Sequence, residues 1–423
     1  MNPVSFICFS GCLGIIISCF RKNADVLSPG RVFGFTWCLA IGLTQLKFSA
    51  HQYEWSAESW IQVLLGPVAF LVGTFVAYVL NLESRLLLVE DIRMNGTADR
   101  INEKRLFVAI SMFFILYVLA YAIIYFVKGV DPVLFALIPG KARREFTLFG
   151  LGMFLHNVVL VVFLTVVYHL FVQEHRSAKR ALKVMSVISI LTYFLLLQRF
   201  QLALAAVMCF ATIYYLTQHL RPRKFAIYAA VITGLFSVVS TLRSTTGDLF
   251  IYYLYRNSQM RFPREYAILT EPYMYVAMNL ENLARGIEKL DHFTYGTFSL
   301  DFVFATTGLK HWLGEYFHLD PTPYLVSSYN TYTSYWSFYR DFGPLGVTAI
   351  PLMLGLGVGM VYYQLRTSPS LWKVTVYGAC VFVMAISFFN NPLQFLWFVY
   401  NMVAILAVLC YVRSPQLSSI GAV

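Results

Sequence analysis

Four arginines lie close together in the most polar part of this sequence: Arg243, Arg256, Arg261 and Arg264. Asp248 is the single acidic residue between the first and the last of them. A guanidinium group stays charged and donates forked hydrogen bonds to phosphate oxygens. The cluster therefore predicts binding of a phosphate or pyrophosphate group. Anionic lipid headgroups at large are the alternative ligand.

Arg199 is a second candidate, because it lies in a short turn between two apolar runs. The run from Val184 to Leu197 has fourteen residues, and such a helix reaches about 21 Å across an apolar core of about 30 Å. We expect the turn to lie below the membrane surface. A guanidinium group there needs an anion, a carbonyl or water, so we interpret Arg199 as part of a site. Snorkelling to the headgroups is the alternative.

A polar stretch from about residue 243 to residue 344 contains the arginine cluster. It holds ten acidic and eight basic residues, and a segment this polar cannot cross a bilayer. Glu271 and Pro272 within it are typical of a helix start. Apolar residues follow at spacings of three and four, at Leu280, Leu283, Ile287 and Leu290. We predict an amphipathic helix whose polar side offers Asn279, Glu281, Arg285 and Glu288.

Several side chains in or near this stretch suit the recognition of sugars. They are Tyr273, Asn279 and Arg285 in the predicted helix, and Tyr339 and Asn391 near the expected membrane edge. Aromatic rings and amides suit sugar faces and hydroxyls. An interfacial aromatic belt would place tyrosines in the same positions, and Asn391 before a proline is also typical of a turn.

A membrane scaffold must position these residues. The chain has 423 residues, of which 58% are hydrophobic and 13% charged, and it contains repeated apolar runs of membrane-spanning length. We predict an all-α polytopic membrane protein with about eleven transmembrane helices and one large external loop that contains amphipathic helices. The first run lacks a basic leader and a cleavage site, so we expect it to be retained. The expected spans are 3–20, 32–46, 60–82, 106–126, 150–171, 184–197, 202–218, 225–242, 345–364, 374–389 and 393–412.

The loops between these spans predict the orientation. The chain would comprise 1–242 with helices one to eight, 243–344 as the large external loop, and 345–423 with the last three helices and a tail. With the tail in the cytoplasm, the inner segments carry eighteen Lys and Arg residues and the short outer loops six. This is a positive-inside bias. The net charge of +11 then faces anionic membrane lipids, and no nucleic acid partner is expected.

Other common chemistries lack their usual markers. All seven cysteines fall inside predicted spans, so a disulfide-stapled external domain is not expected. The histidines are scattered, and no metal site or cofactor is predicted. We find no Walker loop, no dinucleotide glycine pattern and no GxSxG elbow.

The end of the polar stretch, Asn330 to Gly346, enters a predicted span. Within it, Tyr339-Arg340-Asp341-Phe342-Gly343-Pro344-Leu345-Gly346 resembles the Tyr-x-Asp-Phe-Gly-x-x-Gly block of Wzy-type oligosaccharide repeat-unit polymerases. The order of features is similar too: an Arg-bearing turn, a span, a large loop and two or three final spans. The resemblance covers the architecture of the whole chain and about 17 residues at motif level.

The resemblance implies polymerisation of undecaprenyl-pyrophosphate-linked oligosaccharides by metal-independent glycosyl transfer on a GT-C-type fold. It implies the periplasmic side of the bacterial inner membrane, with the amino terminus periplasmic and the carboxyl terminus cytoplasmic. The partners would be a lipid-linked donor and acceptor and a separate Wzz-type chain-length regulator.

Leaving-group chemistry suggests roles for the candidates. A pyrophosphate leaves as a stable anion, so the transition state needs its developing charge stabilised rather than a general acid. We expect Arg199, Arg243 and Arg256 or Arg264 around the pyrophosphate. A carboxylate could take the proton of the attacking sugar hydroxyl, and Glu271 and Asp341 are the candidates. Each could instead cap a helix.

Three other functions remain open from the sequence. A ligase that transfers glycan from the same lipid carrier to lipid A core would share the arginines and the loop. A flippase for lipid-linked oligosaccharides would show charged residues along its helices, which this chain mostly lacks. An acyltransferase would use a membrane-embedded histidine, for which His156 and His169 are the candidates.

Overall fold

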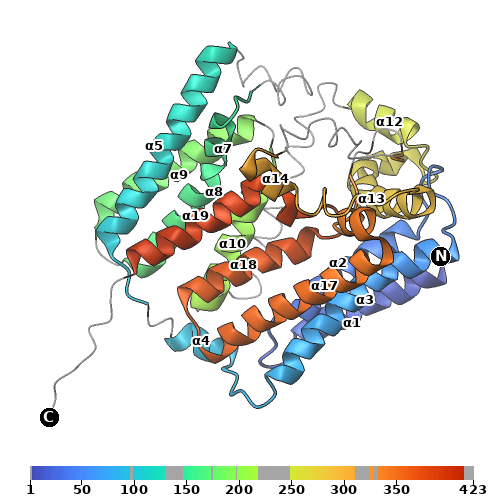
Figure 1. The fold of residues 1–423 in the computed structure, drawn as a ribbon, viewed down its shortest axis with the longest axis horizontal. Coiled ribbons are helices and arrows are strands. Elements are labelled where there is room, and N and C mark those ends of the chain that lie inside the picture. Colours follow the sequence, from blue (N-terminus) through green and yellow to red (C-terminus); the bar gives the residue numbers. More distant parts are fainter. Residues whose placement is uncertain are drawn as a thin grey trace. The chain divides into compact units, whose positions relative to one another are not determined.

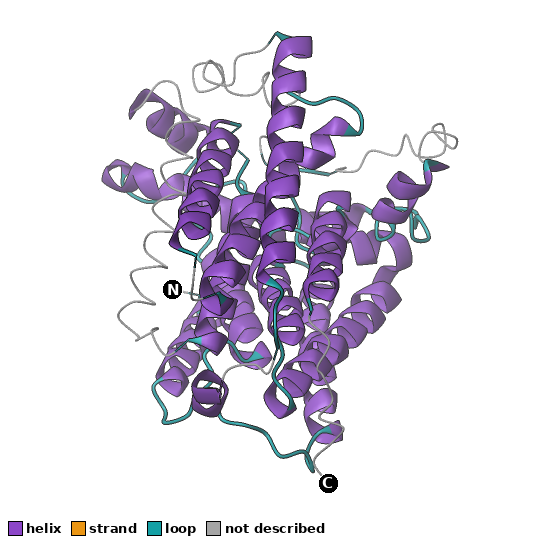
Figure 2. Cartoon of the chain, turned by 90° about the vertical axis from the view of Figure 1, so that its left-hand side faces the viewer, coloured by secondary structure: helices purple, strands orange, loops and turns teal. Residues whose placement is uncertain are grey.

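A computed structural model describes residues 2–95, 99–129, 146–172, 175–196, 198–217, 248–309, 324–326, 329 and 331–413. Apart from isolated β-bridges of Ser49 with Met260 and of Ile101 with Arg413, these residues form helices and loops (Figure 2). The all-α prediction is therefore confirmed for the described part of the chain. The predicted span 225–242 lies outside the described residues.

The chain divides into two compact units that are described separately. Unit 1 comprises Met1–Val89, Thr246–Thr367 and Cys380–Val399, so it joins the amino-terminal helices to the long polar stretch. Its α-helices, labelled in Figure 1, are α1 (Pro3–Cys19), α2 (Pro29–Thr44), α3 (Ala57–Leu80), α12 (Asp248–Asn257), α13 (Thr270–Lys289), α14 (Asp301–Thr307) and α17 (Tyr335–Thr367). It also contains the short 3-10 helices η3 (Arg264–Leu269) and η4 (Pro392–Gln394).

Unit 2 comprises Glu90–Thr245, Ser368–Ala379 and Tyr400–Val423. Its helices are α5 (Glu103–Lys128), α7 (Leu151–Phe154), η2 (Leu155–Asn157), α8 (Val158–Phe171), α9 (Arg176–Leu195) and α10 (Phe200–Leu216). Three helices have residues in both units, and they are α4 (Val89–Asn95), α18 (Leu371–Ile386) and α19 (Leu396–Val412). Within unit 2, α8 packs against α5, α9 and α10.

Several helices are apolar enough for a bilayer. By length and composition, α3, α5, α17 and the continuous Leu151–Phe171 segment could each cross a membrane, while α1, α10, α18 and α19 are shorter apolar helices. Large apolar side chains are exposed on them, including Phe6 (65%), Phe75 (62%) and Val108 (60%). Water disfavours apolar faces of this extent. The chain is thus a membrane-embedded helical protein.

Ten of the eleven predicted spans coincide with described helices, and two of these helices extend well beyond the apolar run. Helix α9 begins at Arg176 rather than at Val184, because Arg and Lys are good helix formers and continue the helix into its basic end. The full helix reaches about 30 Å. The shortness that placed Arg199 below the surface therefore belongs to the apolar part alone.

Helix α17 starts at Tyr335, well inside the stretch predicted as a loop. It is interrupted at Gly343, which has φ 59° and ψ −144°, and Pro344 follows. An L side chain rarely adopts that backbone, and a Cβ here would lie 2.7 Å from the Phe293 ring. Residues 335–342, which precede the break, therefore form a separate helical segment and do not belong to the predicted span 345–364.

Small residues let α3 and α17 approach backbone to backbone. A Cβ on Gly355 would lie 2.0 Å from the carbonyl oxygen of Phe70, and one on Gly73 would lie 2.1 Å from that of Leu352. Gly359 faces Ala77 in the same way. Small residues at spacings of four are typical of close helix pairs in membranes. This pair forms the frame to which the polar part of unit 1 is attached.

We expect Gly355→Ala to destabilise the protein by about 1–3 kcal/mol, because the added methyl group must push the two helices apart. Gly357→Ala is the matched control, since nothing lies within 4 Å of a Cβ at that position on the same helix. The measurement is the thermal unfolding midpoint of each purified variant in detergent. Equal midpoints for the two variants would show that the close contact is unimportant.

Candidate functional site

Helix α13 organises the polar part of unit 1. It begins at Thr270, where Glu271 and Pro272 predicted a start, because a proline in the first turn sacrifices no helical hydrogen bond. It packs against α2, α3 and α17. Of the four apolar positions in the predicted spacing, Leu280, Leu283 and Ile287 are buried, and Leu290 is half-buried directly after the helix.

Polar residues of α13 are buried beside these apolar residues. Asn279, Glu281 and Asn282 are each at most 1% exposed. The sequence predicted Asn279 and Glu281 on a polar side together with Arg285 and Glu288. The helix is therefore covered on more of its circumference than a simple amphipathic helix, and its buried polar groups need partners.

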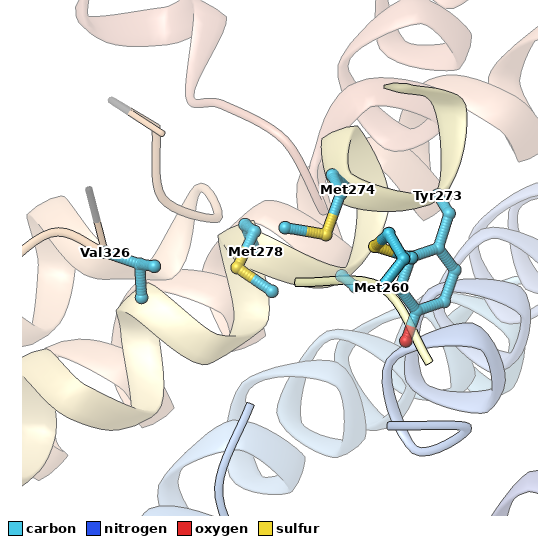
Figure 3. Packing of buried hydrophobic residues seen from close by; sticks show 6 residues of the cluster. Met260, Tyr273, Met274, Met278 and Val326 are labelled. Carbon is cyan, nitrogen blue, oxygen red and sulfur yellow. The ribbon is translucent and has the colours of Figure 1, made fainter. Parts of the chain in front are cut away.

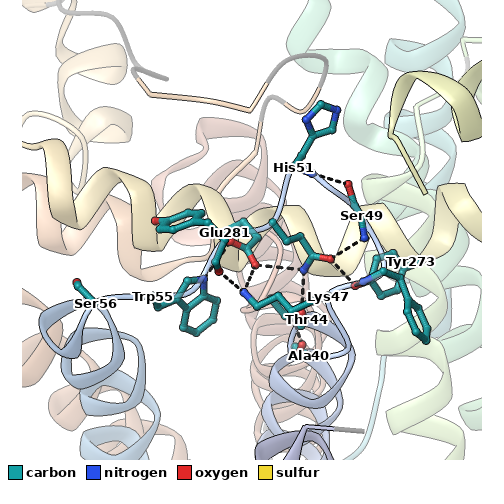
Figure 4. A network of polar contacts seen from close by, with 12 residues as sticks. Ala40, Thr44, Lys47, Ser49, His51, Trp55, Ser56, Tyr273 and Glu281 are labelled. Atoms are coloured by element: carbon teal, nitrogen blue, oxygen red, sulfur yellow. Dashed lines mark hydrogen bonds and ion pairs between the residues drawn. The ribbon is translucent and has the colours of Figure 1, made fainter. Parts of the chain in front are cut away.

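The Glu281 carboxylate accepts three hydrogen bonds from the loop between α2 and α3 (Figure 4). Lys47 Nζ lies 2.7 Å from Oε1, and Gln52 Nε2 lies 3.1 Å from the same oxygen. Trp55 Nε1 donates to Oε2 at 3.0 Å. The carboxylate is 0% exposed and the Lys47 side chain 12%. A buried charge requires such pairing, so this ion pair fastens the loop to α13.

Tyr273 extends the same network (Figure 4). Its hydroxyl donates to Gln52 Oε1 at 2.6 Å and accepts from the Phe48 backbone N–H at 3.0 Å. Burial raises the pKa of Tyr273 to about 12, although the hydrogen bonds with Phe48 and Gln52 oppose the shift. The phenol is thus neutral and serves as a fastener. A role in sugar binding stays a prediction.

The same loop also joins the segment after α12. Ser49 Oγ donates to the Ser258 carbonyl oxygen at 2.6 Å, and the Arg261 N–H donates to that of Phe48 at 2.7 Å. A buried cluster of Met260, Tyr273, Met274, Ala277, Met278 and Val326 packs under this junction (Figure 3). We call residues 45–56 and 248–308 together the polar layer.

The three described arginines of the predicted cluster lie at exposed positions of the polar layer. Arg256 is in the last turn of α12, Arg261 precedes η3, and Arg264 opens η3. Arg264 Cζ lies 4.1 Å from the centroid of the Tyr252 ring, and Arg261 Nη1 donates to the Lys47 carbonyl oxygen at 3.4 Å. A ring face and a carbonyl orient a guanidinium group without neutralising it. The arrangement can therefore bind an anion.

Two carboxylates accompany these arginines in sequence. Glu265 is exposed in η3, and Glu271 is half-buried in the first turn of α13. Burial, opposed by the hydrogen bond with Ser258, raises the pKa of Tyr329 to about 12, and the Glu271 charge adds to the rise. Glu271 is thus a partly accessible carboxylate in the neighbourhood of Tyr329.

Asn279 and Asn282 bind the segment that follows the polar layer. Asn282 Nδ2 donates to the Thr331 carbonyl oxygen at 2.8 Å, and Asn282 Oδ1 accepts from the Val326 N–H at 2.9 Å. Asn279 Oδ1 accepts from the Thr331 hydroxyl. Arg285, one turn further along, is half-buried with its Cζ 5.9 Å from the centroid of the Tyr53 ring. The contact of Asn279 and Arg285 with sugar stays a prediction.

Asp341 holds the short loop before α14 against α17. Its carboxylate is 0% exposed and accepts from the Ser299 N–H at 2.6 Å, the Phe298 N–H at 3.2 Å and the Thr294 hydroxyl at 2.5 Å. A buried carboxylate that accepts three hydrogen bonds has its polar oxygens satisfied inside the protein. We therefore interpret Asp341 as an anchor and keep Glu271 as the candidate base. Asp341 does not cap the following helix, since its donors lie in another loop.

Arg340 beside it is a buried cation that the sequence-based site left out. Its side chain is 4% exposed, with Cζ 4.0 Å from the centroid of the Phe298 ring and 5.8 Å from that of Trp336. Trp336 stacks on Tyr332 at 4.4 Å. Tyr339 is also buried, against Phe293. The Tyr339–Gly343 block is therefore fixed by its aromatic neighbours and by Asp341.

Asn391 connects the last part of unit 1 to the helical segment that precedes Gly343. Its Nδ2 donates to Ser337 Oγ at 3.1 Å, and its Oδ1 accepts from the Leu393 N–H at 3.2 Å at the start of η4. The predicted turn is thus confirmed as the cap of a short helix. Ser387 nearby accepts from Trp37 Nε1 at 2.8 Å and from the Ser334 N–H, also at 2.8 Å.

Ten of the twelve predicted site residues lie in unit 1, and the other two do not. Arg199 belongs to unit 2, where it is half-buried directly before α10. Arg243 lies outside the described residues. In unit 2, the Tyr193 hydroxyl donates to Gln198 Oε1 at 2.6 Å and lies 3.3 Å from His156 Nδ1. His169 Nδ1 lies 2.8 Å from the Thr165 carbonyl oxygen.

The sequence analysis did not identify which charged side chains the fold would bury or largely cover. Lys47 was counted only as an outer-loop charge, and Arg340 only as part of the block. A signal existed for Glu281, because it lies between Leu280 and Leu283 on the predicted apolar spacing. A charged residue among core positions predicts a buried partner. Which base would pair with it could not be read from the sequence.

Glu288 joins the end of α13 to the start of α3. Its Oε1 accepts from the Ser56 N–H at 3.1 Å and from Ser59 Oγ at 2.9 Å. Partial burial acts to raise the pKa of Glu288, but these hydrogen bonds outweigh it and lower the pKa below its usual range. The charged carboxylate is therefore the form that the fold favours.

Comparisons with known proteins identify no relative: no protein-family model, no curated protein and no solved structure matches this chain. Among the described residues, no three His, Cys, Asp or Glu side chains gather as ligands for a metal ion. The site is therefore defined by its arginines, its carboxylates and its aromatic residues.

We expect Glu281→Gln to destabilise unit 1 by about 3 kcal/mol, because it leaves the Lys47 ammonium group buried beside a neutral amide. Adding Lys47→Met should restore part of the loss, since the unpaired charge is then gone. The measurement is thermal unfolding in detergent together with limited proteolysis of the 45–56 loop. A loss no larger than that of Glu288→Gln at neutral pH would contradict the anchoring role of the pair.

The lowered pKa of Glu288 predicts that the stability of the fold depends on pH. Because its folded-state pKa is lowered, its contribution is complete above the unfolded pKa and disappears as the pH falls through the folded value. Between about pH 5 and about pH 3 the wild type should lose more of its stability than Glu288→Gln does. Unfolding midpoints across this range provide the test, and parallel curves for the two proteins would refute it.

Proposed function

We propose that this chain is a membrane glycosyltransferase that joins lipid-pyrophosphate-linked oligosaccharide repeat units, as Wzy-type polymerases do. Two features support the proposal. The order of apolar helices around a long polar stretch is similar to the order in that class. In the Tyr339–Gly343 block every residue except Phe342 is buried, and Asp341 fixes the block, as expected for a motif that shapes a site.

The observation that carries the proposal is the exposed arginine group of the polar layer. Arg256, Arg261 and Arg264 are solvent-exposed, and the backbone around them is held to the 45–56 loop by hydrogen bonds. A pyrophosphate leaving group needs pre-positioned cations rather than a proton donor. Fixed guanidinium groups at the membrane surface supply that requirement, and their forked donors match phosphate oxygens.

The reaction can be written with the residues of this chain. A sugar hydroxyl of one lipid-linked unit attacks the anomeric carbon of the other. The new glycosidic bond forms while the bond to the pyrophosphate oxygen breaks, and the arginines stabilise the negative charge that develops there. Glu271 takes the proton of the attacking hydroxyl. The roles of Arg199 and Arg243 in binding the pyrophosphate stay predictions from the sequence.

The same proposal includes the arrangement in the membrane. Eleven spans on a GT-C-type fold would place the amino terminus and the polar layer in the periplasm and the carboxyl terminus in the cytoplasm of a bacterial inner membrane. The positive-inside bias supports this orientation. Donor and acceptor would reach the polar layer from the outer leaflet, and a Wzz-type regulator would set the chain length.

The test is glycan profiling of a deletion strain that expresses the wild type or a variant at equal membrane level. The deletion should leave single repeat units on the acceptor, and the wild type should restore a ladder. We expect Arg261→Gln with Arg264→Gln, and separately Arg199→Gln, to lower ladder formation about 100-fold or more. Lys289→Gln is the control, since it removes an exposed charge from α13 alone.

Each outcome decides between the candidates. Loss of even single-unit transfer in the deletion strain would favour the ligase that moves glycan to lipid A core. Full rescue by the Arg261/Arg264 variant would remove the polar layer from the pyrophosphate site. Full rescue by Arg199→Gln would favour the alternative that Arg199 only snorkels to the lipid headgroups.

A further inference from the structure

Unit 2 contains a cavity of about 440 Å³ where α5 begins, α18 begins and α19 ends. This volume falls within the range of small-molecule sites, about 300–1,000 Å³. The lining residues belong to three short segments, 99–101, 368–373 and 409–413. The cavity takes no part in the proposed glycosyl transfer, which uses unit 1 residues and Arg199 and Arg243.

Positive charge dominates the cavity walls. Arg100, Lys373 and Arg413 line it, against the single carboxylate of Asp99. Asp99 Oδ2 accepts from the Leu371 N–H at 2.5 Å, so this carboxylate is already bonded to the start of α18. The balance of the lining is therefore cationic, and an anionic group is the ligand that complements it.

Backbone hydrogen bonds hold two of the segments that line the cavity to each other. The Asn102 N–H donates to the Val412 carbonyl oxygen at 2.8 Å, and Ile101 pairs with Arg413 in a β-bridge. Lys373 Nζ donates to the Ser368 carbonyl oxygen at 2.8 Å, which holds the ammonium group at the rim. Fixed cations bind an anion with less loss of side-chain entropy than mobile ones.

Aromatic residues indicate that the cavity lies at the level of lipid headgroups. Trp372 is 43% exposed and Tyr411 is 55% exposed, and both stand at ends of apolar helices. Arg105 Cζ lies 5.3 Å from the centroid of the Tyr411 ring. Exposed Trp and Tyr at helix ends are typical of the membrane interface. Loop charges predict that this end faces the cytoplasm, whose leaflet is anionic.

We infer that this cavity binds the phosphate headgroup of an anionic phospholipid. The three cations receive the phosphodiester, while Leu371, Trp372 and Leu409 offer apolar contact to the start of an acyl chain. That apolar wall beside an interfacial tryptophan favours a lipid over free phosphate. Binding would join the 99–101 segment, the start of α18 and the end of α19.

The test uses the purified full-length chain in detergent and native mass spectrometry of lipid adducts. Phosphatidylglycerol should bind at least tenfold more tightly than phosphatidylcholine. The variant Arg100→Gln, Lys373→Gln, Arg413→Gln should lose this preference. The control variant Arg21→Gln, Lys22→Gln, Arg180→Gln should keep it, because it removes three exposed bases from segments with the same predicted orientation.

Inorganic phosphate is the competing ligand. Stabilisation by phosphate at concentrations that also displace phosphatidylglycerol would overturn the lipid assignment in favour of a free phosphate site. Equal lipid binding by the two triple variants would overturn the site itself. A photoactivatable phosphatidylglycerol on the wild type gives a reading that is independent of variant folding. Crosslinks in 99–105, 368–373 or 409–413 support the site, and crosslinks confined to other segments refute it.

Discussion

The burial of one carboxylate constrains the whole polar part of unit 1. Glu281 lies on α13 with no exposed surface, so its charge must be met by donors inside the protein. Those donors come from Lys47, Gln52 and Trp55 in the loop between α2 and α3. A loop near the start of the chain is thereby locked to a helix more than two hundred residues later. Removal of either charge leaves the other unpaired, which makes this contact a condition of the fold.

The charges in and beside the polar layer fall into two groups with different roles. Glu281 and Asp341 are buried, the Lys47 side chain is 12% exposed, and all three are satisfied and structural. Arg256, Arg261 and Arg264 are exposed, and of these Arg264 lies over a ring and Arg261 donates to a backbone carbonyl. The first group fixes the backbone on which the second group stands. Electrostatic stabilisation of a leaving group depends on such fixed donors, because a mobile donor must be ordered again in every turnover.

The sequence predicted the helices well, because apolar runs and the spacing on α13 follow from the local pattern of residues. The extension of α17 was missed, since its first residues, Tyr335 to Phe342, are aromatic and polar and read as a loop. Their helix is stabilised by burial against Trp37, Phe298 and α13. Nor could the sequence assign Asp341, whose donors from the 294–299 segment come together only in the folded chain.

The site was harder to predict for the same reason, because its contacts join segments that are far apart in the sequence. The arginine group was predicted from its clustering along the chain, and the three of its members that the structure describes occupy exposed positions. Tyr273, Asn279 and Asn391 were also selected by residue type, and each is engaged in hydrogen bonds within unit 1. Residue type indicates what a side chain can bind. Only the fold decides whether its partner is another part of the protein.

The most direct measurement is elongation by the purified wild-type chain, given a defined lipid-pyrophosphate-linked repeat unit and no other protein. The proposal predicts a ladder of longer lipid-linked glycans, with one lipid pyrophosphate released for each bond formed and no loss of rate in a metal chelator. Transfer of single units to a lipid A core acceptor without elongation would contradict it. So would complete inactivity of a folded protein with its natural repeat unit.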